Sequence, residues 1–103
     1  MVNRKILEAV DRLSLFYENT LDLESLSFRR NILYAIRELA FKPPDYNGKQ
    51  SLIISMKAEH SISDMIMTTE SILKELNFQF FKIKKSGHDY YQGTNFIEFE
   101  VNA

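Results

Sequence analysis

Lysines stand next to tyrosines in the last third of the chain, and this combination suits a nucleic-acid strand. The residues concerned are Lys82, Lys84, Lys85, His88, Tyr90 and Tyr91. Cationic side chains that bind phosphates, beside rings that stack on bases, are the chemistry of single-strand recognition. Acidic residues such as Glu98 and Glu100 lie in the same segment, and lysine in an edge strand also protects a sheet against aggregation. Nucleic-acid binding is therefore an alternative function rather than the favoured one.

The two histidines, His60 and His88, are the candidates for metal binding. Each has an acidic neighbour, Glu59 and Asp89 respectively. No spacing such as His-x-x-x-His places two ligands on one helical face, however. The chain also contains no cysteine, which excludes thiolate ligands and thiol nucleophiles. We therefore expect neither a metal nor another cofactor.

Motifs of catalysis and of phosphate binding are missing from the sequence. There is no Gly-x-Ser-x-Gly elbow, and the isolated Gly48, Gly87 and Gly93 match no phosphate-binding loop. Glu98 and Glu100 share one strand face, which is typical of a solvated sheet surface rather than of paired catalytic carboxylates. We expect that the protein is not an enzyme. A small-molecule-sensing regulatory domain, which can bind ligands through its backbone without a motif, stays a second alternative.

A helix predicted over Ser61–Asn77 is the central element of the C-terminal half. Its apolar stripe has the spacing of one helical face and comprises Ile62, Met65, Ile66, Thr69, Ile72, Leu73 and Leu76. Ser61 and Asp64 form a variant of the capping box at its start, and Asn77 suits a left-handed stop at its end. The stripe predicts that this helix packs on a sheet.

Two further helices are predicted over residues 4–18 and 23–41. Asn3 is available as the first N-cap, and Pro43-Pro44 ends the second helix because proline cannot donate a helical hydrogen bond. Together they predict a helical hairpin over residues 1–42. The second helix carries Arg29, Arg30 and Arg37, which are either solvated surface or a grip for an acidic partner or a nucleic acid.

Strands are predicted over Ser51–Lys57, over residues 78–85 and over residues 90–101, the last with a bend or break near Gly93. A turn is expected at residues 86–89. The fold class is therefore α+β: an N-terminal helical hairpin, then a β-α-β-β unit over residues 51–101 with a small mixed or antiparallel sheet of 3–4 strands. A crossover through the helix would make the first two strands parallel, and the last two would form an antiparallel hairpin; the order of the strands is left open.

Alternation divides the apolar strand residues between two faces of this sheet. One set can face the helix: Leu52, Ile54, Met56, Phe81, Ile83, Ile97, Phe99 and Val101. Ile53, Phe78, Phe80 and Phe96 then lie on the other face. A contiguous apolar patch of this kind is rarely left in water, so we expect that either the helical hairpin or a partner covers it.

Composition places the chain among folded, single-domain proteins. It has 103 residues, of which 45% are hydrophobic and 26% charged, and the net charge is −1. A charge this small gives no general attraction to nucleic acid or to an anionic membrane. The N-terminus has no signal-peptide hydrophobic region, and no apolar run is long enough to span a bilayer. The absence of cysteine fits a reducing compartment, so we expect a cytoplasmic protein without a transmembrane segment.

Part of the second half resembles kinase-associated domains that bind anionic lipids and regulate attached kinases. The resemblance rests on Ser55-Met56-Lys57, on Asp64-Met65-Ile66 and on residues 96–101, and it covers about half of the chain. It implies a strand, helix, strand, strand arrangement and a regulatory role. It assigns no functional residue here.

These observations favour a small protein-protein interaction module that acts as a regulator, inhibitor or assembly subunit through an apolar and aromatic sheet surface. The partner is another protein or a second copy, with a homodimer expected. The predicted contact residues are of the types that anchor interfaces: Phe80, Phe96, Tyr90, Tyr91, Arg29 and Arg30.

Overall fold

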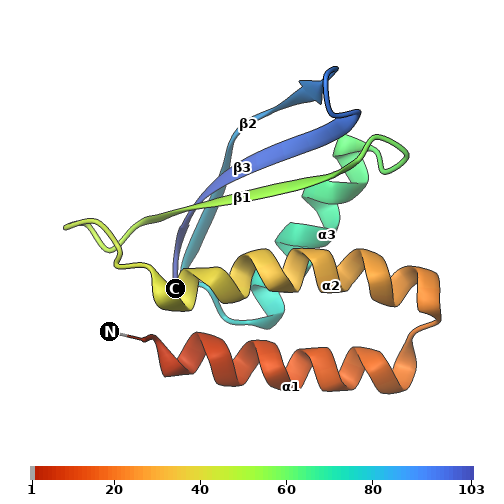
Figure 1. Cartoon of the computed structure of the whole chain (residues 1–103). Helices are drawn as coiled ribbons and strands as arrows, with labels where there is room; N and C mark the ends of the chain where they lie inside the picture. Colours follow the sequence, from red (N-terminus) through yellow and green to blue (C-terminus); the bar gives the residue numbers. More distant parts are fainter. Residues whose placement is uncertain (1) are drawn as a thin grey trace. The chain divides into compact units, whose positions relative to one another are not determined.

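The computed structural model describes residues 2–103 and has the α+β class expected from the sequence. The chain divides into two compact units, with Pro43 as the last residue of the first and Pro44 as the first residue of the second. The first unit is helical and the second contains the sheet (Figure 1). Whether they form the predicted single domain stays a prediction, and each unit is described separately below.

The first unit is a helical hairpin, as predicted. Its helices are α1 (Arg4–Thr20) and α2 (Leu23–Glu38), and the 3-10 turn η1 (Leu39–Phe41) follows. Asn3 accepts a hydrogen bond from the N–H of Ile6 at 3.2 Å and begins α1. Asp22 does the same for Ser25 at 2.8 Å and begins α2. Both residues are preferred N-caps because their side-chain oxygens satisfy helical N–H groups that lack a partner.

The cap at Asp22 depends on the charge of its carboxylate. Hydrogen bonding from the backbone N–H of Ser25 lowers the pKa of Asp22 below its ordinary value. A carboxyl group whose pKa is lower in the folded state contributes stability above its unfolded pKa. This contribution is lost as the pH falls through the folded pKa. The hairpin therefore loses this support only in acid.

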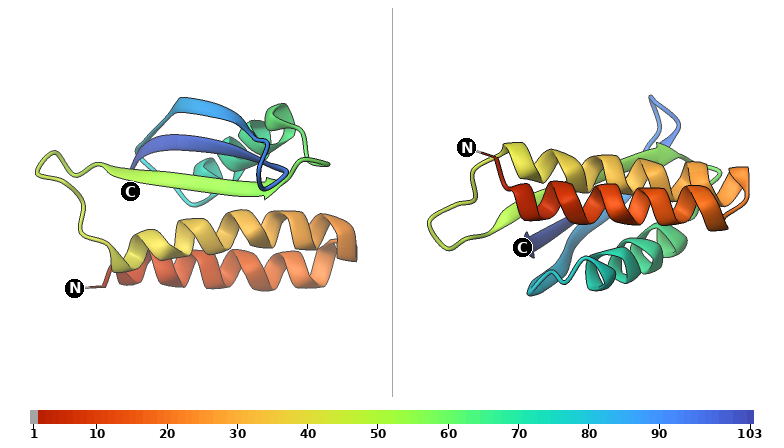
Figure 2. Two further views of the ribbon diagram at one scale, coloured as in Figure 1. Left: turned by 45° about the horizontal axis from the view of Figure 1, so that its top comes forward. Right: turned by 90° about the horizontal axis from the view of Figure 1, so that it is seen from below.

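The second unit consists of β1 (Gln50–Lys57), α3 (Ile62–Glu75), β2 (Phe80–Asp89) and β3 (Thr94–Asn102). The strand order is β1-β3-β2, and β3 is antiparallel to both neighbours (Figure 2). β1 and β2 consequently run in the same direction, as the crossover predicts, but they are not neighbours. Of the two sheet types expected, the antiparallel sheet is confirmed and the mixed sheet is wrong.

A physical reason for this order lies in the composition of the strands. The inward side chains of β3, Ile97, Phe99 and Val101, are all 0% exposed. β2 carries three lysines instead, and lysine is favoured on sheet edges. The most apolar strand therefore takes the centre, where both of its edges are paired.

The core of this unit lies between α3 and one face of the sheet. α3 contacts β2 and β3, and it buries Met65, Thr69, Ile72 and Leu73, which belong to the predicted stripe. Ser61 caps it by accepting a hydrogen bond from the N–H of Asp64 at 3.1 Å. Asn77 adopts the left-handed conformation, with φ 62°. In residues 2–103 no helix has both the length and the apolar character that a membrane crossing requires.

The predicted turn at residues 86–89 is wrong, because β2 continues to Asp89 and the chain reverses at residues 90–93. Gly87 lies inside the strand opposite Phe96. Gly93 has φ +64° and provides the left-handed residue at the reversal. Either Gly87 or Gly93 could mark the reversal in the sequence, and the pairing of β2 with β3 places it at Gly93.

Candidate functional site

The face of the sheet opposite α3 is called the reverse face below. The sequence predicts an aromatic surface on this face. Residues opposite each other in an antiparallel pair point to the same face, so the register defines its members. They are Ser51, Ile53, Ser55, Lys57, Phe80, Lys82, Lys85, Gly87, Asp89, Thr94, Phe96, Glu98, Glu100 and Asn102. The reverse face is therefore more polar than its apolar members alone suggested.

The predicted contiguous patch on this face is wrong. Phe78 precedes β2 and is only 9% exposed, so it belongs to the buried residues. Phe80 pairs with Asn102 and Phe96 pairs with Gly87. The six-residue separation of Phe96 and Asn102 along β3 corresponds to about 20 Å. Glu98 and Glu100 lie between them, because every second residue of β3 faces this side.

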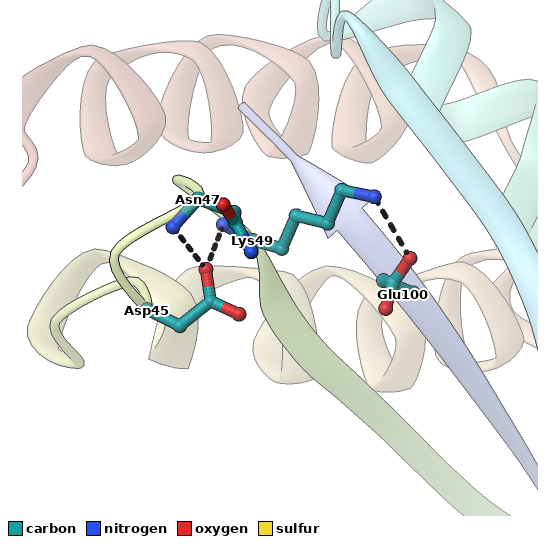
Figure 3. A network of polar contacts seen from close by, with 4 residues as sticks. All are labelled: Asp45, Asn47, Lys49 and Glu100. Carbon is teal, nitrogen blue, oxygen red and sulfur yellow. Dashed lines mark hydrogen bonds and ion pairs between the residues drawn. The ribbon is translucent and has the colours of Figure 1, made fainter.

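One end of the reverse face is organised by Lys49. Its ammonium lies 3.3 Å from a carboxylate oxygen of Glu100 and 4.7 Å from the ring centre of Phe80. In the turn that leads to Lys49, Oδ1 of Asp45 accepts hydrogen bonds from the N–H groups of Asn47 at 2.8 Å and Lys49 at 2.9 Å (Figure 3). The turn thus fixes the start of β1, and the Lys49 ammonium lies over the ring of Phe80.

The other end of the reverse face carries a small apolar cluster. Gly87 leaves room for the ring of Phe96, since a Cβ atom at this glycine would lie 2.9 Å from Cε1 of the ring. Ile53 lies opposite Glu98 and is a diagonal neighbour of Phe96 on the same face. Ile53 is 59% exposed, so this cluster is the part of the reverse face that presents apolar surface.

The lysines proposed for nucleic acid do not form one cationic surface. Lys85 lies 3.6 Å from Glu98, and Lys82 lies opposite Glu100 in the register. Lys84 falls in an irregularity of the β2–β3 pairing, a β-bulge. His88 pairs with Asn95 instead, on the same side of the sheet as Ile97. The carboxylates beside the lysines reduce the attraction to a polyanion.

The reversal at residues 90–93, called the tyrosine turn below, carries two highly exposed aromatic side chains. Tyr90 is 87% exposed and Tyr91 is 102% exposed. Oδ1 of Asp89 accepts hydrogen bonds from the N–H groups of Tyr91 at 3.0 Å and Gln92 at 3.2 Å. The N–H of Gly93 donates to the backbone oxygen of Asp89 at 2.8 Å. Both rings are therefore held outward by a fixed backbone.

The two histidines approach the same residue, Asn95, but do not form a metal site. Nδ1 of His88 lies 2.8 Å from Oδ1 of Asn95, whose Nδ2 donates to the backbone oxygen of His60 at 2.8 Å. The ring of His88 also meets the ring of Tyr90 edge-on, with centres 4.6 Å apart. Within residues 2–103, no group of three or more His, Cys, Asp or Glu side chains is arranged to hold a metal ion.

The arginines of α2 join the two helices of the first unit. Arg29 donates to the hydroxyl of Tyr17 at 3.0 Å and lies over its ring at 5.1 Å. Arg30 forms an ion pair with Glu18, and Arg37 lies 3.8 Å from Asp11. Their guanidinium groups make these contacts within the hairpin.

Sequence reasoning found the tyrosines but missed the residues that position them. Asp89 and Asn95 were not singled out for this role, and neither was Asp45 for positioning Lys49. An Asp that is followed by backbone N–H groups in a turn is a recognisable signal, because its carboxylate mimics a backbone acceptor. Asn95 gives no comparable signal, since its partners His60 and His88 are distant in the sequence.

Comparisons with protein-family models, with curated proteins and with solved structures find no match to this chain. The resemblance to kinase-associated domains stays a prediction, as does the small-molecule alternative.

Proposed function

We propose that this protein is an interaction module that binds a partner protein through the tyrosine turn. The observation that carries the proposal is the exposure of Tyr90 and Tyr91 on a backbone fixed by Asp89. Tyrosine is enriched among the residues that dominate binding energies. It offers a large amphipathic surface at a small cost in conformational entropy. A turn that is already ordered adds little further cost on binding.

The charge distribution favours a protein partner over a nucleic acid. Three lysines in or next to the sheet lie beside or opposite a carboxylate, namely Lys49, Lys82 and Lys85. The chain as a whole has a net charge of −1. Binding to phosphates would require several uncompensated cations and would fall steeply with salt.

The test compares three forms of the protein as bait in an extract of the native host. These are the unaltered chain, the double variant Tyr90→Ser/Tyr91→Ser, and the control Tyr46→Ser. Tyr46 is a matched control because it is 97% exposed and also follows an aspartate that caps a turn. A protein retained by the unaltered chain and the control, but lost from the double variant, is then purified for measurement of its Kd.

We expect the double variant to bind this partner at least about tenfold more weakly, since loss of anchoring tyrosines typically costs more than about 1.4 kcal/mol. The control should bind like the unaltered chain. Circular dichroism should show the same folded signal for all three forms, because the substituted side chains are exposed. Equal affinity of the double variant and the control would contradict the proposal.

A further inference from the structure

The outer edge of β1 has open hydrogen-bonding groups only in its middle. The N–H of Ala58 donates to the backbone oxygen of Gly93 at 3.0 Å, in line with the regular β1–β3 register. Along an antiparallel strand, residues that hydrogen-bond to the neighbouring strand alternate with residues whose backbone groups point away from it. Since Ala58 bonds to Gly93, which directly precedes β3, the even-numbered residues of β1 are the ones that pair with β3. The N–H and C=O groups of the odd-numbered residues point away from the sheet.

Both ends of this edge are closed by the chain itself. The N–H of Lys49 donates to Asp45, and its C=O accepts from the N–H of Asp45 at 2.9 Å. At the other end, the C=O of Lys57 accepts from the N–H of His60 at 3.0 Å. Within the second unit (residues 44–103), no backbone hydrogen bond reaches the outward groups of Ser51, Ile53 and Ser55. These three residues are called the open edge below.

The open edge carries none of the features that protect sheet edges. Residues 50–56 contain no charge and no proline, and the β1–β3 register is unbroken. The opposite edge, β2, has both lysines and a bulge. Unprotected edges of this kind pair with strands of other chains.

From these observations we infer that the open edge is the contact between two copies of this chain, joined strand to strand in an antiparallel homodimer. Two-fold symmetry requires a surface that is complementary to itself. With Ile53 on the axis, Ser51 lies opposite Ser55 of the second copy and the two Ile53 side chains meet. The whole uncharged stretch then pairs with itself, so no charge opposes another within it.

The flanking charges make the dimer sensitive to salt in a defined direction. In this register Lys49 lies opposite Lys57 of the second copy, and Glu100 compensates only one of them. Screening reduces repulsion between exposed charges. The dimer is therefore expected to strengthen as salt is raised, whereas nucleic-acid binding would weaken. This contact is separate from the tyrosine turn.

The first test is the molar mass in solution by sedimentation velocity, from low to high micromolar concentration. The mass should rise from 12.1 kDa toward twice that value, because a contact of a single strand pair is small and gives a weak dimer. Ile53→Lys should remain a monomer throughout, since it places two ammonium groups on the axis. Met67→Lys is the matched control: Met67 is 66% exposed, and the substitution adds the same charge on α3.

The second test uses the absence of cysteine from the natural chain. Opposed residues of a hydrogen-bonded pair have Cα atoms about 5.5 Å apart, which is within disulfide range. Ile53→Cys should therefore give a covalent dimer under mild oxidation. Ser51→Cys and Ser55→Cys should not, because each of these residues lies about 13 Å from its own symmetry mate.

A single mass of 12.1 kDa at every concentration, or equal crosslinking of all three cysteine variants, would overturn the dimer. Neither outcome bears on the tyrosine turn. Tyr90→Ser/Tyr91→Ser should still dimerise, and Ile53→Lys should still capture the partner of that turn. The two proposals thus fail separately.

Discussion

The two edges of the sheet differ in what their strands bury and in how they meet solvent. β1 buries its inward side chains Leu52, Ile54 and Met56, which are 1%, 2% and 4% exposed. The inward side chains of β2, Phe81 and Ile83, are only half-buried. β2 also carries Lys82, Lys84 and Lys85 and a bulge at Lys84, whereas β1 is regular and uncharged over most of its length.

This difference separates two requirements on an edge strand. An edge must be anchored by its inward side chains, and it must avoid uncontrolled pairing by its outward backbone groups. β2 meets the second requirement with charge and irregularity and is anchored weakly. β1 is anchored strongly and leaves three residues open. The β1 edge is therefore either a binding surface or a risk of aggregation, and the β2 edge is neither.

The largest expected effect breaks the anchoring of β1. Ile54→Ala should lower the free energy of unfolding by about 2–4 kcal/mol, because it removes a fully buried side chain and leaves a cavity. Ile83→Ala on β2 should cost less, about 1–2 kcal/mol, because that side chain is half-buried. Urea unfolding followed by circular dichroism measures both. Equal losses would show that the two edges are anchored equally.

An intermediate effect tests how β2 fits against β3. Gly87→Ala would place a Cβ atom 2.9 Å from Cε1 and 3.0 Å from Cζ of Phe96. The ring must move, so we expect a loss of about 1–2 kcal/mol. The same substitution combined with Phe96→Ala should cost less than the sum of the two single changes, as residues in contact couple. Additive losses in thermal unfolding would contradict this contact.

The smallest effect concerns the charges that protect β2. Lys85→Ala removes the ion pair with Glu98 at 3.6 Å. The lysine side chain is 67% exposed, so the loss should be below about 1 kcal/mol and should shrink at high salt. Lys84→Ala is the control and should change stability by less than this. A salt-independent loss at Lys85 would indicate that its aliphatic stem, rather than its charge, stabilises the strand.

The local elements could be predicted from the sequence because each has its own period. The stripe from Ile62 to Leu76 predicts α3, and the alternation from Leu52 to Met56 predicts β1 and its inward face. Asn3 and Ser61 mark helix starts through the chemistry of their own side chains. Each of these signals depends on residues only a few positions apart.

The candidate surface was predicted only in part. Tyr90 and Tyr91 were selected as contact residues by their residue type. The sequence placed them at the start of a strand, whereas they lie in the reversal at residues 90–93. Their fixed backbone depends on where β2 ends, which depends in turn on the register with β3. The link from Lys49 to Glu100 and the link from Arg29 to Tyr17 join residues whose separation in sequence hides their contact.

The α+β class, the order of the elements and the inward faces of β1 and β3 follow from local sequence patterns alone. Periodicity and capping are local properties that persist whatever the strands pair with. Three further features depend on the folded chain: β3 lies between β1 and β2, the chain reverses at residues 90–93, and Ser51, Ile53 and Ser55 form the outer edge of β1. Local propensity gives several strand registers almost the same free energy, so pairing between distant segments must select one. The observed register is selected because it buries Ile97, Phe99 and Val101 on one face.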